Sequence, residues 1–145
     1  MGDGYRLGPV RDERARQQRI REGDLAAAVG DARATQATVD AARAVAERAR
    51  DAIAAARSAR DAQLAAGAKT HEIALSERHL TRLVRNLDGA QDALARALAS
   101  HRGQVAAIDA ARNRLVLARA DKEIIERHFA RWRTERTKLA ERRED

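Results

Sequence analysis

The sequence contains no cysteine, a single proline, and one residue each of phenylalanine, tryptophan and tyrosine. The lack of cysteine excludes a disulfide framework, a cysteine-ligated zinc site and a thiol nucleophile. Large apolar residues are also few, because leucine, isoleucine, valine and phenylalanine together number 26 of 145 residues. Since these residues and the other aromatics supply most of a compact core, this chain cannot build a thick one.

Segments that would direct the chain into a membrane are also missing. No apolar run approaches the roughly 20 residues that span a bilayer. The opening residues, Met1-Gly2-Asp3-Gly4-Tyr5, lack the basic and apolar regions of a signal peptide. We therefore expect a cytoplasmic protein with no membrane insertion.

Alanine and charged residues dominate the sequence. Charged residues make up 35% of the chain, and 29 basic against 22 acidic residues give a net charge of +7. Alanine, arginine, glutamate and leucine are strong helix formers. The single proline and the absence of β-branched runs leave strands poorly supported. The composition therefore predicts an all-α fold built from long helices.

The second half of the chain carries a heptad-like repeat. Steps of three and four residues from Ile73 to Leu139 meet an apolar residue at fifteen of twenty positions. A repeat of 3.5 residues held over this length predicts a coiled-coil helix with a narrow buried seam. The positions are Ile73, Ser76, Leu80, Leu83, Leu87, Ala90, Leu94, Ala97, His101, Gln104, Ile108, Ala111, Leu115, Ala118, Lys122, Ile125, Phe129, Trp132, Arg136 and Leu139.

The first half carries the same repeat with smaller side chains. Upstream of it, Ile20 and Leu25 are five residues apart, which predicts a slip of the repeat near Gly23. Small side chains let two helices approach closely, so this seam fits the leucines of the second half. Nine of its ten positions are apolar: Leu25, Ala28, Ala32, Thr35, Val39, Ala42, Ala46, Ala49, Ile53 and Ala56.

A break near the middle of the chain separates the two repeats. Gly67 is expected to end one helix, and Thr70 to cap the next. We predict a single long antiparallel two-helix coiled-coil hairpin over residues 1–145. Its helices are expected over about 10–66 and 71–142, with the turn over about 67–70.

An antiparallel hairpin with this turn pairs residues whose numbers sum to about 137. Val39 then faces Leu98, and Tyr5 lies near Trp132 with Phe129 close by. All three aromatic residues are therefore expected where the two ends of the chain meet.

The excess positive charge is expected at the same place. Residues 1–23 hold six basic and four acidic residues, and residues 112–145 hold eleven and seven. Tryptophan, tyrosine and arginine dominate binding hot spots. Phe129 and Trp132 are therefore predicted either to close the open end of the hairpin or to anchor a protein partner, and the two roles are compatible.

The sequence gives no support for catalysis. Phosphate-binding, nucleophile-elbow and zinc-protease motifs are absent. The histidines lack the spacing of helical metal ligands, and His101 falls in the seam, where we interpret it as a polar residue that sets the register. We expect a non-enzymatic protein with no cofactor, metal or small-molecule substrate.

Nucleic acid is a weaker candidate partner. The 26 arginines suit phosphates, but many are matched by an acidic residue at helical spacing, as in Arg43–Glu47 and Asp92–Arg96. Such interleaved charges are typical of a solvated helix face, and no aromatic platforms for base stacking occur along the helices.

With these features in view, the chain resembles the central-stalk proteins of type III secretion, the flagellar FliJ and injectisome YscO family. The resemblance covers nearly the whole chain. It rests on the length, the paired helices and the absence of cysteine. It also rests on the opening Tyr5-Arg6-Leu7 followed by Val10-Arg11 and Glu13-Arg14, and on the charged ending over residues 121–133.

The resemblance implies a cytoplasmic stalk, peripheral to a membrane-embedded secretion apparatus, that couples a hexameric secretion ATPase to an export gate. Export chaperones are implied as additional partners. The alternatives are a generic coiled-coil adaptor or self-assembling structural protein, and a basic nucleic-acid-binding rod. The expected contacts with the export gate, at the turn, are His71, Leu75 and His79. The expected contacts with the ATPase are Tyr5, Arg6, Arg127, Phe129, Arg131, Trp132, Arg133 and Arg136.

Overall fold

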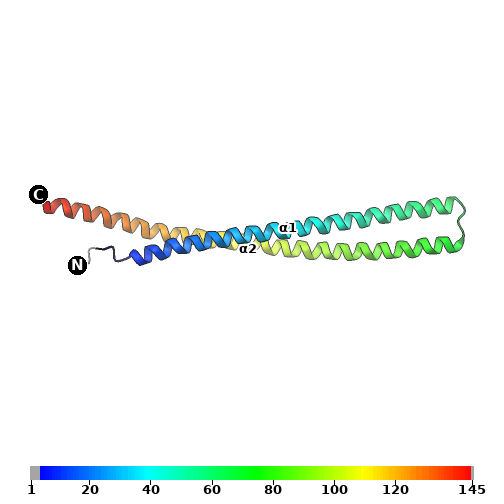
Figure 1. Cartoon of the computed structure of the whole chain (residues 1–145), viewed down its shortest axis with the longest axis horizontal. Coiled ribbons are helices and arrows are strands. Elements are labelled where there is room, and N and C mark those ends of the chain that lie inside the picture. The colour runs from blue at the N-terminus through cyan, green and yellow to red at the C-terminus, as the bar shows by residue number, and fades with distance from the viewer. Residues whose placement is uncertain (1–3, 145) are drawn as a thin grey trace. The chain divides into compact units, whose positions relative to one another are not determined.

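The computed structural model describes residues 4–144 and contains two α-helices, α1 over Gly8–Ala65 and α2 over Thr70–Glu144. The helices pack against each other in opposite directions, so the chain is an antiparallel helical hairpin (Figure 1). The predicted all-α class and hairpin arrangement are confirmed. Pro9 lies in the first turn of α1, where its missing N–H has no helical partner to lose.

The hairpin divides into two units, each containing a stretch of both helices. Unit 1 comprises the described residues 4–30 and 106–144, and unit 2 comprises Asp31–Val105 with the turn. Each unit is described separately below.

The predicted seam positions lie at the contact between the helices. All ten positions from Leu25 to Ala56 are buried or half-buried, and so are those from Ile73 to Arg136. Leu139 is the exception, with 53% of its surface exposed. It follows that the repeat identified the buried face of both helices. The buried apolar residues are Ala32, Val39, Ala46, Ile53, Leu80, Ala90, Ala97, Ala111, Leu115 and Ile125.

Unit 2 holds seven of these ten residues and is joined mainly through apolar contacts. Polar contacts join the two helices near the turn, at Arg60–Glu77 and Gln63–Ser76. Further along the seam, Thr35 Oγ1 lies 2.9 Å from His101 Nδ1. The same hydroxyl donates to the Ala32 carbonyl at 3.0 Å. A hydroxyl has one proton, so it can accept a hydrogen bond from the Nδ1–H while it donates to the carbonyl. His101 is therefore a satisfied polar group at the seam.

The predicted slip of the apolar repeat near Gly23 is absent from unit 1. The repeat continues upstream of Leu25 without a change of phase, and Ile20 lies off the seam with 45% exposure. Polar residues with long side chains occupy the seam there, and their aliphatic stems cover the partner helix while their ends reach acidic groups or water. The upstream seam positions are Arg21, Gln18, Arg14, Arg11 and the apolar Leu7, and all but the exposed Arg14 are half-buried.

The turn is built by a glycine and a glutamate. Gly67 has a positive φ of 74°. The N–H of Gly67 donates to the Leu64 carbonyl, and that of Ala68 to the Gln63 carbonyl, which is the Schellman pattern at a helix end.

The start of α2 differs from the expectation for Thr70. Thr70 lies inside the helix, and Lys69 is the capping residue, because its carbonyl accepts from the N–H groups of Glu72 and Ile73. The Glu72 carboxylate accepts from the Lys69 N–H at 2.9 Å. This is the glutamate half of a capping box, which satisfies a backbone donor without a threonine cap.

Candidate partner-binding site

The three aromatic residues form one cluster in unit 1. The ring of Tyr5 lies 5.0 Å from that of Phe129, edge-on, and 5.2 Å from that of Trp132. Phe129 and Trp132 stack with their ring centres 5.7 Å apart. Such contacts stabilise by more than their buried area alone. The expected proximity of Tyr5 to Trp132 and Phe129 is confirmed.

Arg11 joins this cluster to the salt bridges of unit 1. Its guanidinium carbon lies 4.0 Å from the centre of the Phe129 ring, and its Nε donates to Glu126 Oε1 at 2.7 Å. This hydrogen bond lowers the pKa of Glu126 and raises the pKa of Arg11. Arg11 therefore holds the aromatic cluster and the neighbouring carboxylate in one arrangement.

Two predicted site arginines cover the outer side of the cluster. The guanidinium carbon of Arg133 lies 5.9 Å from the Phe129 ring centre, and that of Arg136 lies 5.5 Å from the Trp132 ring centre. Both distances fall within the range of cation–π contacts. Arg133 is exposed and Arg136 is half-buried.

The remaining predicted residues of this end lie in solvent beside the cluster. Arg6 and Arg131 are exposed. Arg127 is exposed as well and pairs with Glu123 one turn earlier on α2. The structure therefore brings five of the eight predicted residues into contact, and the other three form a charged border.

Two residues of the cluster were not selected from the sequence. The first is Arg11, although the antiparallel pairing, in which residue numbers sum to about 137, places it opposite Glu126. His128 was the other: its Nδ1 lies 2.8 Å from the Tyr5 hydroxyl oxygen, and the two rings are 5.7 Å apart. Tyr5 precedes α1, so a helical repeat could not fix which side of α2 it meets.

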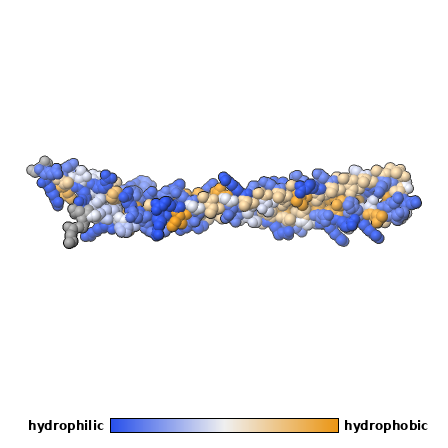
Figure 2. Space-filling view, in the orientation of Figure 1, coloured by the Kyte–Doolittle hydropathy of each residue, from blue (hydrophilic) through white to orange (hydrophobic). Residues whose placement is uncertain are grey.

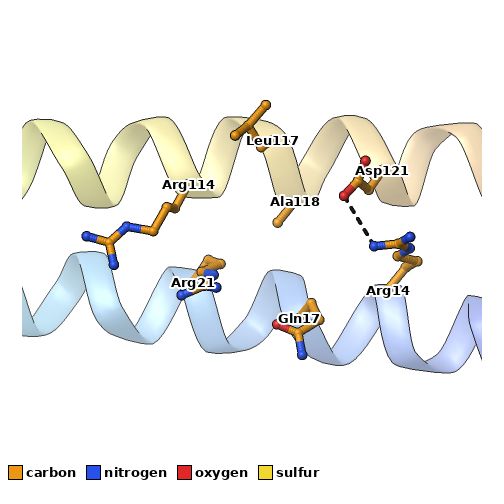
Figure 3. Close-up of a pocket in the computed structure, with 7 residues that line it drawn as sticks. All are labelled: Arg14, Gln17, Arg21, Arg114, Leu117, Ala118 and Asp121. Atoms are coloured by element: carbon orange, nitrogen blue, oxygen red, sulfur yellow. Dashed lines mark hydrogen bonds and ion pairs between the residues drawn. The ribbon is translucent and has the colours of Figure 1, made fainter.

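A basic groove lies between the helices of unit 1 (Figure 3). Arg14 donates to Asp121 across it at 3.3 Å. The walls carry three arginines and one carboxylate, so the groove suits an acidic side chain of a partner. Its residues are Arg14, Gln17, Arg21, Arg114, Leu117, Ala118 and Asp121.

The predicted residues near the turn are all exposed, and Leu75 and His79 line different grooves. Leu75 is 60% exposed and shares a groove with Arg78, Arg82 and two neighbours. His79 lines another groove with Leu83 and several alanines of α1. Figure 2 shows apolar surface on this part of unit 2. His71 lies in the first turn of α2.

The described residues offer little for metal or membrane chemistry. Among residues 4–144, no group of three histidine, aspartate or glutamate side chains lies close enough to hold a metal ion. Neither helix, within the same range, has an apolar stretch that meets the requirements for crossing a membrane.

Comparison with known proteins gives no relative. No protein-family model, curated protein or solved structure matches the chain.

Proposed function

We propose that this protein is a non-enzymatic cytoplasmic stalk of a bacterial type III secretion system, which couples the hexameric secretion ATPase to the export gate. The observation that carries the proposal is the aromatic cluster of unit 1, with its cover of arginines beside the two ends of the chain. The resemblance of the terminal residues to the central-stalk family supports the same assignment.

The cluster has the chemistry of a protein-binding anchor. Tryptophan, tyrosine and arginine contribute most to binding hot spots. Trp132 and Phe129 are stacked, and Arg133 and Arg136 lie over them, so few rotamers remain to be fixed on binding. We assign this cluster, with the border of Arg6, Arg127 and Arg131, to the ATPase.

The groove beside Leu75 is our proposed contact with the export gate. An exposed leucine flanked by Arg78 and Arg82 suits an acidic partner that has an apolar depression. His71 and His79 belong to the same proposed surface. Export chaperones are additional proposed partners.

Binding to the purified hexameric ATPase tests the assignment of the two ends. We expect the double variant Trp132→Ala, Arg133→Glu to bind at least about 30-fold more weakly, because hot-spot residues contribute about 2 kcal/mol or more. The matched control near the turn, Leu75→Ala with Arg78→Glu, should bind like the unmodified chain. Arg133→Glu alone changes an exposed side chain and shows whether the charge matters when the stacked rings remain.

Two outcomes would count against the proposal. Undiminished ATPase binding by the Trp132 and Arg133 variant would remove the assigned contact. Tight binding to DNA or RNA, falling steeply between low and physiological salt, would favour the nucleic-acid-binding alternative.

A further inference from the structure

The outer face of α2 in unit 1 carries a second apolar repeat. It follows the same alternating steps of four and three residues as the buried seam, but on the solvent side of α2, and its member Leu117 also lies at the edge of the groove of unit 1. Every residue in it is exposed. This outer stripe consists of Ala106, Ala110, Asn113, Leu117, Ala120 and Ile124.

The outer stripe contains the most exposed large apolar side chains among the described residues. Leu117 is 66% exposed and Ile124 is 67% exposed, and Val116 beside them is 61% exposed. Figure 3 shows Leu117 pointing away from α1. Single exposed apolar residues need no explanation, but a regular heptad row of them marks a face that packs against another helix.

Asn113 indicates what kind of helix fits this face. A side-chain amide both donates and accepts hydrogen bonds, so an asparagine that meets its own copy can satisfy it. In a parallel pair of identical helices, Asn113 faces Asn113 of the second copy, and Leu117 faces Leu117. In an antiparallel pair whose two stripes overlap fully, Leu117 would lie against Asn113, which leaves an amide without a polar partner.

The charges on either side of the stripe also favour a parallel pair of identical helices. Residues that flank such a row interact with residues five positions further along the neighbouring helix. Asp109 would then meet Arg114 of the second copy, and Glu123 would meet His128. Both pairs are attractive, and each forms twice in a symmetric dimer.

Asp109 and Glu123 already form ion pairs within α2, and these pairs compete only weakly with contacts to a second copy. Asp109 lies 3.8 Å from Arg112, and both side chains are about two-thirds exposed, as are Glu123 and Arg127 in their pair. Exposed pairs of this kind contribute little. His128 uses Nδ1 for Tyr5, so Nε2 is the nitrogen that would meet Glu123.

We propose that a second copy of this chain binds the outer stripe, with the two α2 helices parallel and in register. The interface covers about three heptads and contains three alanines and one polar residue. We therefore expect a reversible dimer that forms in the micromolar range or above. The proposal is independent of the secretion function.

The absence of cysteine allows a direct test of the register by disulfide formation. Asn113→Cys should give a covalent dimer under mild oxidation, because position 113 meets itself. Ala27→Cys, at an exposed position of α1 in the same unit, should remain largely monomeric. If Asn113→Cys forms no more dimer than Ala27→Cys, the parallel register is wrong. Preferential crosslinking between Asn113→Cys and Leu117→Cys chains would show an antiparallel pair and overturn it as well.

Sedimentation equilibrium over protein concentrations from about 1 µM to about 1 mM tests the stripe itself. The full chain should shift from monomer to dimer, and Leu117→Glu should weaken this association by at least about 10-fold. Ile20→Glu, an exposed isoleucine on α1, is the matched control and should dimerise normally. A full chain that stays monomeric throughout, or a loss of association that is equal in both variants, would overturn the proposal. Circular dichroism checks that both variants remain helical.

Discussion

Leu115 and Leu117 provide a controlled comparison between the two faces of α2. They are the same residue type in the same helix, two positions apart, yet Leu115 is 4% exposed and Leu117 is 66% exposed. Replacing each by alanine removes three carbon atoms from two different surroundings. The difference in unfolding free energy therefore measures the contribution of the buried seam.

The expected magnitudes follow from burial. Each buried carbon contributes about 0.8 kcal/mol, so Leu115→Ala should cost about 2.5 kcal/mol, and any remaining cavity adds to that. Leu117 is one-third buried, which limits its loss to about 0.8 kcal/mol, and the higher helix propensity of alanine offsets a few tenths of this. With a urea dependence of about 2 kcal/mol per M, the midpoint should fall by about 1 M for Leu115→Ala and by about 0.3 M for Leu117→Ala.

Trp132 makes the measurement specific to unit 1. It is the only tryptophan in the chain, so its fluorescence during urea unfolding reports the aromatic cluster, while circular dichroism reports both helices. The experiment is done at about 1 µM, where association through the outer stripe is weak. Equal midpoint shifts for the two variants would refute the assignment of Leu115 to the buried side and Leu117 to the solvent side.

Two further predictions concern an ion pair and the turn. Because hydrogen bonding to Arg11 lowers the pKa of Glu126, its stabilising effect is present at neutral pH and lost as the pH falls through the lowered pKa. The urea midpoint followed by Trp132 fluorescence should therefore drop less on acidification in Glu126→Gln than in the unmodified chain, and equal drops would contradict this. Gly67→Ala should destabilise the hairpin by about 1 kcal/mol in thermal unfolding, because alanine is disfavoured at a φ of 74°. An unchanged or raised melting temperature would show that the left-handed turn is not required.

The sequence predicted the helix contact well, because apolar periodicity depends only on local spacing. The row from Ile73 and the alanine-rich row from Leu25 were both found at the interface. The position of the turn also predicts which residues face each other, because the numbers of paired residues sum to about 137. The ion pairs Arg11–Glu126 and Arg60–Glu77 follow this rule.

The errors arose where polar residues take part in packing. Counting Ile20 as a seam residue predicts a slip of the repeat near Gly23, whereas Arg21 with its long stem occupies the seam position. Residue type alone predicts Thr70 as the cap, whereas the Glu72 carboxylate reaches back to the Lys69 N–H.

The surfaces for binding were harder to derive from the sequence. A search for one apolar face explains the seam and leaves the outer row containing Leu117 and Ile124 unnoticed. Rotamers decide which arginines cover an aromatic ring, so spacing alone could not separate Arg133 from Arg131.

Site-specific photocrosslinking tests most directly whether the paired ends are the part of this chain that binds the secretion ATPase. A photoreactive phenylalanine analogue is introduced at Arg131, beside the aromatic cluster, or at Leu75, near the turn; both side chains are exposed. We expect efficient crosslinking to the hexameric ATPase from position 131 and background crosslinking from position 75. Crosslinking from position 75 alone, or from neither position, would contradict the assignment of the ATPase contact to the aromatic cluster.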